Sequence, residues 1–169
     1  MNILQQYIHL SRYARFREDD GRRENLNETA DRYINFFKNR LSLPTQVWEE
    51  LRKGIIDLEV MPSMRALMSA GPALERENLC GYNCAYLAID SVEALSEILY
   101  ILMCGTGVGF SVERQVIAKL PLVPSEPMTG DFEGEWCVGD SKEGWAEAYQ
   151  HLLNCLWFEN RIPAFDFTQ

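Results

Sequence analysis

Cysteines and glycines are the residues of this chain whose chemistry most needs an explanation. Cys80 and Cys84 are separated by three residues in "CGYNCAYLAID", and His9 and His151 lie far from both. A structural zinc site needs two close Cys or His pairs, so we expect no metal here. If residues 80–84 are extended, the two Cα atoms lie about 13 Å apart, too far for a disulfide. The remaining cysteines are widely spaced: Cys104, Cys137 and Cys155.

The surroundings of each cysteine suggest different roles. Cys104 and Cys155 lie in apolar, helix-like stretches and are expected to be small core residues, whereas Cys137 lies in a loop without a clear role. Cys84 lies beside Asn83 in an alternating stretch typical of a strand. Taken by themselves, these residues favour a buried core thiol at Cys84 over a reactive one.

The glycine cluster "GTGVGF", residues 105–110, lies in the wrong context for a familiar phosphate loop. Dinucleotide and Walker loops follow a strand and open a helix, whose free N–H groups bind phosphate. Here the glycines follow a helical stretch and open a strand. Two interpretations remain. One is a tight turn in which Gly105 ends the helix, and the other is a backbone that another group approaches closely.

Hydrophobic periodicity places these residues in an α/β arrangement. Helices are expected from Asn25 or Asn27 and from a cap at Thr45, and residues 11–25 are expected to be a solvated lead-in. A strand at 83–89 precedes a helix that Asp90 or Ser91 caps, with Glu93 completing a capping box. The later elements follow in order: a strand at 109–113, a loop at 121–140, a helix capped by Ser141 and a strand-like end at 164–169. We therefore predict a helical region at 1–60 and an α/β region at 61–169.

Composition narrows the classes of function. The 169 residues carry a net charge of −9, which argues against a nucleic-acid-binding protein because such a protein needs a basic face. No apolar run reaches 18 residues, and the N-terminus lacks the pattern of a secretory signal. A cytoplasmic protein without membrane contact is expected, and in that compartment cysteines are usually free, metal-bound or redox-active.

Four blocks of sequence, in this order and spacing, resemble the first part of a ribonucleotide reductase catalytic chain of the adenosylcobalamin-dependent, class II type. The blocks are "GYNCAYLAID", "EILYILMCGTGVGFSVERQ", "SKEGWAEAYQHLL" and "PAFDFTQ". In addition, "YARFREDDGRREN" with "NETADR" resembles the start of the monomeric, triphosphate-reducing branch. The resemblance implies the first strands and helices of a ten-stranded α/β barrel, which is incomplete in this chain.

The resemblance also implies roles for single residues. Cys84 would lie beneath the ribose as one of two cysteines that supply reducing equivalents. Asn83 and Ser63 would contact the ribonucleotide substrate, and Gly107 would let the backbone pass close to it. A deoxynucleotide effector would lie near two further residues and the segment 111–120: Asp90 and Ser91.

The rest of such an enzyme would have to come from elsewhere. The resemblance implies that the radical-forming cysteine, the second redox cysteine and most adenosylcobalamin contacts belong to a C-terminal part. We therefore expect an N-terminal fragment or split subunit that works by thiyl-radical chemistry once a C-terminal chain completes it. A dithiol protein such as thioredoxin would be its reductant. The alternative is an inactive nucleotide-binding or interaction module derived from the same family.

Overall fold

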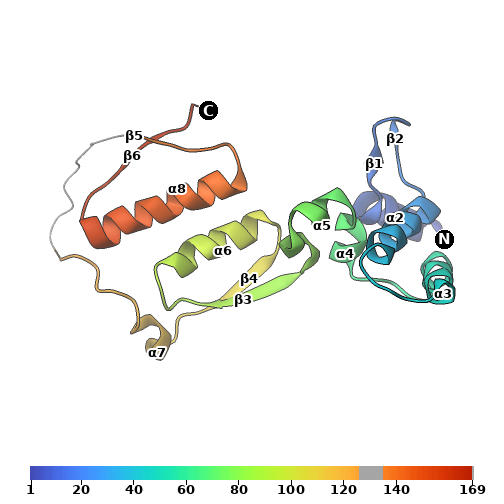
Figure 1. Ribbon diagram of the computed structural model, residues 1–169, viewed down its shortest axis with the longest axis horizontal. Helices are drawn as coiled ribbons and strands as arrows, with labels where there is room; N and C mark the ends of the chain where they lie inside the picture. Colours follow the sequence, from blue (N-terminus) through green and yellow to red (C-terminus); the bar gives the residue numbers. More distant parts are fainter. Residues whose placement is uncertain (126–134, 169) are drawn as a thin grey trace. The chain divides into compact units, whose positions relative to one another are not determined.

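The computed structural model describes residues 1–125 and 135–168, and the chain divides into two compact units, Met1–Tyr82 and Asn83–Gln169 (Figure 1). The boundary predicted after residue 60 lies inside the first of these units and stays a prediction. Within the described residues, no helix is both long and apolar enough to cross a membrane.

The first unit is a group of short helices with one small hairpin. Its elements are α1 (Ile3–Ile8), a π-helix (His9–Tyr13), β1 (Phe16–Arg17), β2 (Arg22–Arg23), α2 (Leu26–Lys38), α3 (Thr45–Ile56), α4 (Met64–Ser69), α5 (Pro72–Arg76) and a 3-10 helix (Asn78–Gly81). The hairpin pairs Phe16 with Arg23, so the segment expected to be a solvated lead-in is ordered. Arg17 and Arg22 both pair with Glu28 of α2, which ties the hairpin to that helix.

Local signals explain where α2 begins, and they fail at α3. The predicted cap at Asn25 is confirmed, because its side chain accepts from the Glu28 N–H while the Glu28 side chain accepts in return. The predicted cap at Thr45 is wrong. Pro44 occupies the capping position, and its carbonyl accepts from the Val47 N–H at 3.0 Å, so the helix begins one residue early. Apolar residues of the two helices form one core cluster: Ala30, Ile34, Trp48 and Ile55.

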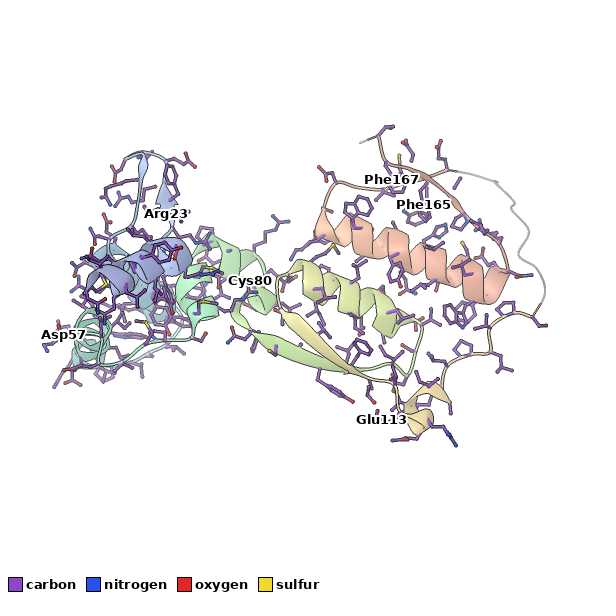
Figure 2. All side chains as sticks on the ribbon, turned by 180° about the vertical axis from the view of Figure 1, so that it is seen from behind. Arg23, Asp57, Cys80, Glu113, Phe165 and Phe167 are labelled. Atoms are coloured by element: carbon purple, nitrogen blue, oxygen red, sulfur yellow. The ribbon has the colours of Figure 1, made fainter. Side chains whose placement is uncertain are left out.

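The second unit is built from two pairs of parallel strands and the helices between them. Its elements are β3 (Cys84–Ala88), α6 (Glu93–Met103), β4 (Gly107–Ser111), α7 (Arg114–Ile117), β5 (Glu135–Cys137), α8 (Lys142–Asn154), a π-helix (Cys155–Glu159) and β6 (Ala164–Asp166). β3 pairs with β4, and β5 pairs with β6. The α/β prediction is confirmed, whereas the described residues contain no closed barrel. Phe165 and Phe167 reach from the β6 end of the chain toward α8 (Figure 2).

Two boundaries in this unit differ from the sequence-based expectation. β4 begins at Gly107, two residues earlier than expected, because its register pairs Gly107 with Cys84. The loop expected at 121–140 contains β5, although residues 126–134 lie outside the described residues. The cap at Ser141 and the turn at Gly105 are confirmed, since Ser141 accepts from the Gly144 N–H and Gly105 has a φ of +84° after α6.

Candidate functional site

Cys84 begins strand β3 on the sheet face that points away from α6. The alternation along the strand leaves Cys84 and Tyr86 exposed, whereas Ala85 and Leu87 are half-buried. On the other face, Phe110 of β4 lines an apolar cavity together with side chains of α6. The helix therefore covers one side of the strand pair, and the thiol lies on the uncovered side.

The residue opposite Cys84 has no side chain. Gly107 is its register partner on β4, and the Gly107 N–H donates to the Asn83 carbonyl at 3.0 Å. A Cβ at Gly107 would lie 3.6 Å from that carbonyl oxygen, which is ordinary contact. Packing within the chain thus tolerates a side chain at this position, and the glycine leaves the space beside the sulfur empty.

The structure brings together three of the predicted substrate residues, and it places the fourth in the other unit. Asn83, Cys84 and Gly107 are neighbours at one end of the strand pair, and all three are exposed. Ser63 belongs to the first unit, where its hydroxyl caps α4 by accepting from the Ala66 N–H at 3.1 Å. Its contact with substrate stays a prediction.

The two predicted effector residues follow the far end of β3. Neither Asp90 nor Ser91 takes the capping position of α6, which is Val92, and Glu93 is the first residue of the helix and completes no capping box. The Asp90 carboxylate instead pairs with Lys119 at 3.2 Å. Ser91 does support the helix, since its hydroxyl accepts from the Ala94 N–H at 3.3 Å. The Asp90–Lys119 pair joins this corner to the segment 111–120, so the predicted effector elements are adjacent.

The other cysteines of the second unit have partners that Cys84 lacks among the described residues. Cys155 is fully buried with its sulfur 3.6 Å from His151 Nε2, and burial raises the pKa of its thiol, as expected for a core residue. Cys104 is half-buried and accepts from the Lys142 ammonium at 3.2 Å, so its setting is less apolar than expected. Cys137 is exposed and donates to Asp166 on the adjacent strand at 3.4 Å.

Two residues that the sequence did not single out share the face of Cys84. Tyr86 has Gly109 as its register partner, just as Cys84 has Gly107. These four residues form what we call the open face of the second unit. The alternation of "CAYLA" together with glycine at every second position of "GVGF" carries this signal, but only the parallel register sets the two patterns side by side.

Comparison with known proteins finds similarity to the same family that the four sequence blocks resemble. No protein-family model matches the chain. The chain is 25% identical to the probable adenosylcobalamin-dependent ribonucleoside-triphosphate reductase of Dictyostelium discoideum, over 98% of this chain and 26% of that protein. A crystal structure of a B-12-dependent (class II) ribonucleotide reductase matches 95% of this chain with a TM-score of 0.78 and 21% identity.

The extent of these matches defines what the chain has in common with the reductases. It spans about a quarter of the curated relative and 32% of the matching crystal structure. Because the sequence identity to the crystal structure is only 21%, that match establishes a similar fold and nothing more. The predicted resemblance is confirmed: along nearly its whole length, this chain is similar to one part of an adenosylcobalamin-dependent, class II ribonucleotide reductase.

Proposed function

We propose that the chain is the N-terminal part of an adenosylcobalamin-dependent ribonucleotide reductase and that Cys84 supplies reducing equivalents to the substrate. The observation that carries the proposal is an exposed thiol on the open face, opposite a glycine, in a chain similar to such a reductase along 98% of its length. A buried sulfur would have no access to a nucleotide. Asn83, next to Cys84, and Ser63 are proposed to contact the same substrate.

The chemistry requires a second thiol. Replacing the 2′-hydroxyl of a ribose with hydrogen releases water and consumes two electrons and two protons. Two thiols supply these as they become one disulfide, and Cys84 is one of the two. The other thiol and the cysteine that forms the thiyl radical belong to a C-terminal chain. An external dithiol protein of the thioredoxin type then reduces the disulfide and resets Cys84 for the next turnover.

The strand pairs support a partner chain. Parallel sheets are found almost only where both faces are covered, and a strand at a sheet edge carries unpaired backbone groups. Here β3 and β4 form a sheet of two strands with the open face uncovered. We infer that a C-terminal chain adds strands to this sheet and closes the space above Cys84.

The cofactor would be held by that C-terminal chain. Two cavities of the second unit, of about 570 and 250 Å³, are lined by aliphatic and aromatic side chains without charged or amide groups. Adenosylcobalamin carries many amide groups and a phosphate, so these linings do not fit it. When bound to the assembled enzyme, it would supply the radical that starts reduction.

The curated relative and the sequence near the N-terminus indicate which nucleotides the enzyme would bind. The curated relative is named as a triphosphate reductase, and the segment beginning at Tyr13 resembles the triphosphate-reducing branch, so a ribonucleoside triphosphate is the proposed substrate. The corner where Asp90 pairs with Lys119, beside Ser91, is the proposed site of a deoxynucleotide effector.

Reconstitution tests the proposal. The chain is mixed with a C-terminal reductase chain that carries the two further cysteines, adenosylcobalamin, a dithiol reductant and a ribonucleoside triphosphate, and deoxynucleotide is measured by chromatography. We expect multiple turnover, which Cys84→Ser abolishes because no disulfide can form. Cys137→Ser is the matched control, since Cys137 is also exposed and serine keeps the donor to Asp166. A fully active Cys84→Ser variant would refute the role of Cys84, and nucleotide binding without any reduction would support an inactive binding module.

A further inference from the structure

Tyr86 is a large aromatic residue exposed in the middle of a paired strand. Its side chain is 67% exposed although both neighbours, Ala85 and Leu87, are half-buried. It lies two residues after Cys84 on the same face, at a separation of roughly 6.6 Å along the strand. Aromatic residues are enriched in strands because their rings bury area against neighbouring side chains, and that explanation fails for the exposed Tyr86.

The strand beside Tyr86 offers a flat, side-chain-free surface. Its register partner is Gly109, and the partner of Cys84 is Gly107. A Cβ at Gly109 would lie 3.9 Å from the Ala85 carbonyl oxygen, an ordinary contact, and neither glycine has a positive φ. Glycine inside a strand weakens it and often marks a place that a ligand approaches closely. Since nothing in the described part of the second unit requires either glycine, we attribute both to a group from outside.

We propose that Tyr86 stacks on the nucleobase of the ribonucleotide whose ribose lies at Cys84, with Gly107 and Gly109 as the floor beneath both. This inference rests on the proposed function and extends it to the base. A base is joined to its ribose by a single bond, so the two groups lie close together. Their separation is compatible with the spacing of Cys84 and Tyr86, which are alternate residues of one strand. Stacking uses the π-face that every base has, so the site accepts purines and pyrimidines alike.

Protection of Cys84 from alkylation tests the inference on the full chain. Iodoacetamide modification of Cys84 is followed by mass spectrometry against increasing ATP, CTP or ribose 5-triphosphate, which lacks the base. Cys137, also exposed, is the internal control that no ligand protects. We expect Tyr86→Ala to weaken protection by ATP and CTP about 5- to 100-fold, the usual range for a lost stacking contact, and to leave protection by ribose 5-triphosphate unchanged. Tyr86→Phe keeps the ring and should behave like the unmodified chain.

Two further variants separate stacking from general effects. Tyr7→Ala is the matched control, because Tyr7 is 66% exposed in the first unit and its loss should change nothing. Gly109→Val keeps Tyr86 but places a side chain on the surface where the base would lie. It should therefore also weaken the binding of ATP and CTP. The inference fails, while the proposed function stands, if the ligands protect Cys84 in the Tyr86→Ala chain as well as in the unmodified chain. It also fails if this substitution weakens protection by all three ligands equally. If no ligand protects Cys84 in the unmodified chain, the inference fails, and the reconstitution assay described above decides the proposed function separately.

Discussion

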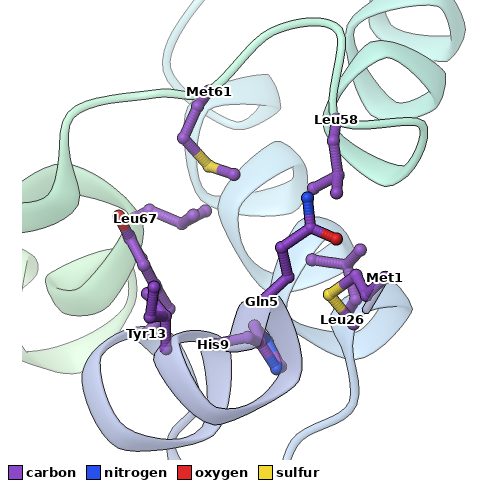
Figure 3. Close-up of a pocket in the computed structure, with 9 residues that line it drawn as sticks. Met1, Gln5, His9, Tyr13, Leu26, Leu58, Met61 and Leu67 are labelled. Carbon is purple, nitrogen blue, oxygen red and sulfur yellow. The ribbon is translucent and has the colours of Figure 1, made fainter. Parts of the chain in front are cut away.

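A chain of buried polar contacts connects four residues of the first unit. The Thr29 hydroxyl donates to Glu24 at 3.0 Å, and Arg32 donates to both oxygens of the same carboxylate. His9 lies on the wall of an apolar cavity (Figure 3), with Nε2 3.0 Å from the Thr29 oxygen. Because that hydroxyl already donates to Glu24, His9 donates to it from Nε2. Arg32 also binds the Leu67 carbonyl, so the network joins α2 to α4.

This network makes the stability of the first unit depend on pH. Burial lowers the pKa of His9, with a further lowering from the charge of Arg32 and an opposing effect of Glu24. The unfolded chain therefore takes up the proton first, near the ordinary value of 6.5. We expect full stability above that pH and a loss of up to about 1.4 kcal/mol per pH unit as the pH falls below it. The unfolding free energy is measured in urea between pH 7.5 and 5.0, with hydrogen exchange in α2 peptides as the probe of the first unit.

A substitution isolates the contribution of His9. His9→Gln keeps a donor for Thr29 but does not titrate, so its unfolding free energy should stay nearly constant over this range. The pKa of Glu24 is also lowered, mainly by hydrogen bonds from Arg32 and Arg15 against the effect of burial. Its contribution is lost only as the pH falls below about 4.5, outside the window. An unchanged pH slope in His9→Gln would contradict the assignment.

At the scale of elements, the sequence predicts those helix and strand boundaries that depend on contacts between residues close together in the chain. The start of α2 at Asn25 depends on contacts within four residues, so it was predictable. The register of β3 with β4 joins Cys84 to Gly107 across a crossover helix, and no local pattern encodes it. The lost cap at Asp90 has the same cause, since its partner Lys119 lies far along the chain. Cys84 was found through family resemblance, whereas its exposure needed three-dimensional structure.

The start of α8 depends on a close approach between two glycines. The Gly144 N–H donates to Ser141 at 3.0 Å, and a Cβ on Gly144 would collide with the backbone of Gly139. Alanine normally stabilises a helix relative to glycine by up to about 1 kcal/mol. Here we expect Gly144→Ala to destabilise the chain by roughly 1–3 kcal/mol, because a backbone has to shift. Urea unfolding measures the difference.

The same substitution at the other glycine of this contact, Gly139, is the control. A Cβ on Gly139 would meet only the Gly144 Cα, at 3.9 Å, so Gly139→Ala should stay within about 0.5 kcal/mol of the original chain. If Gly144→Ala is as stable as the original chain, the close approach does not constrain α8.

At the scale of the whole molecule, large apolar side chains are exposed around the strand pair of the second unit. Phe110 is 58% exposed and Val112 is 60% exposed beside this strand pair, and Leu122 is 93% exposed. In the first unit, α2 and α3 share a core cluster that contains the fully buried Ala30. The described residues thus combine a helical core in the first unit with a two-stranded sheet in the second, beside which apolar side chains are exposed.

Hydrogen exchange should reveal this difference directly. In the isolated chain, peptides covering β3 and β4 should exchange quickly, because each strand has one edge whose N–H groups lack a strand partner. When the proposed C-terminal chain is added, these peptides should gain protection as new strands pair with both edges. Peptides from α2 and α3 should not change, since these helices share a core cluster of their own, and they serve as the internal reference. If the two chains co-elute as a complex while β3 and β4 still exchange at the original rate, the partner binds elsewhere and does not close the sheet around Cys84.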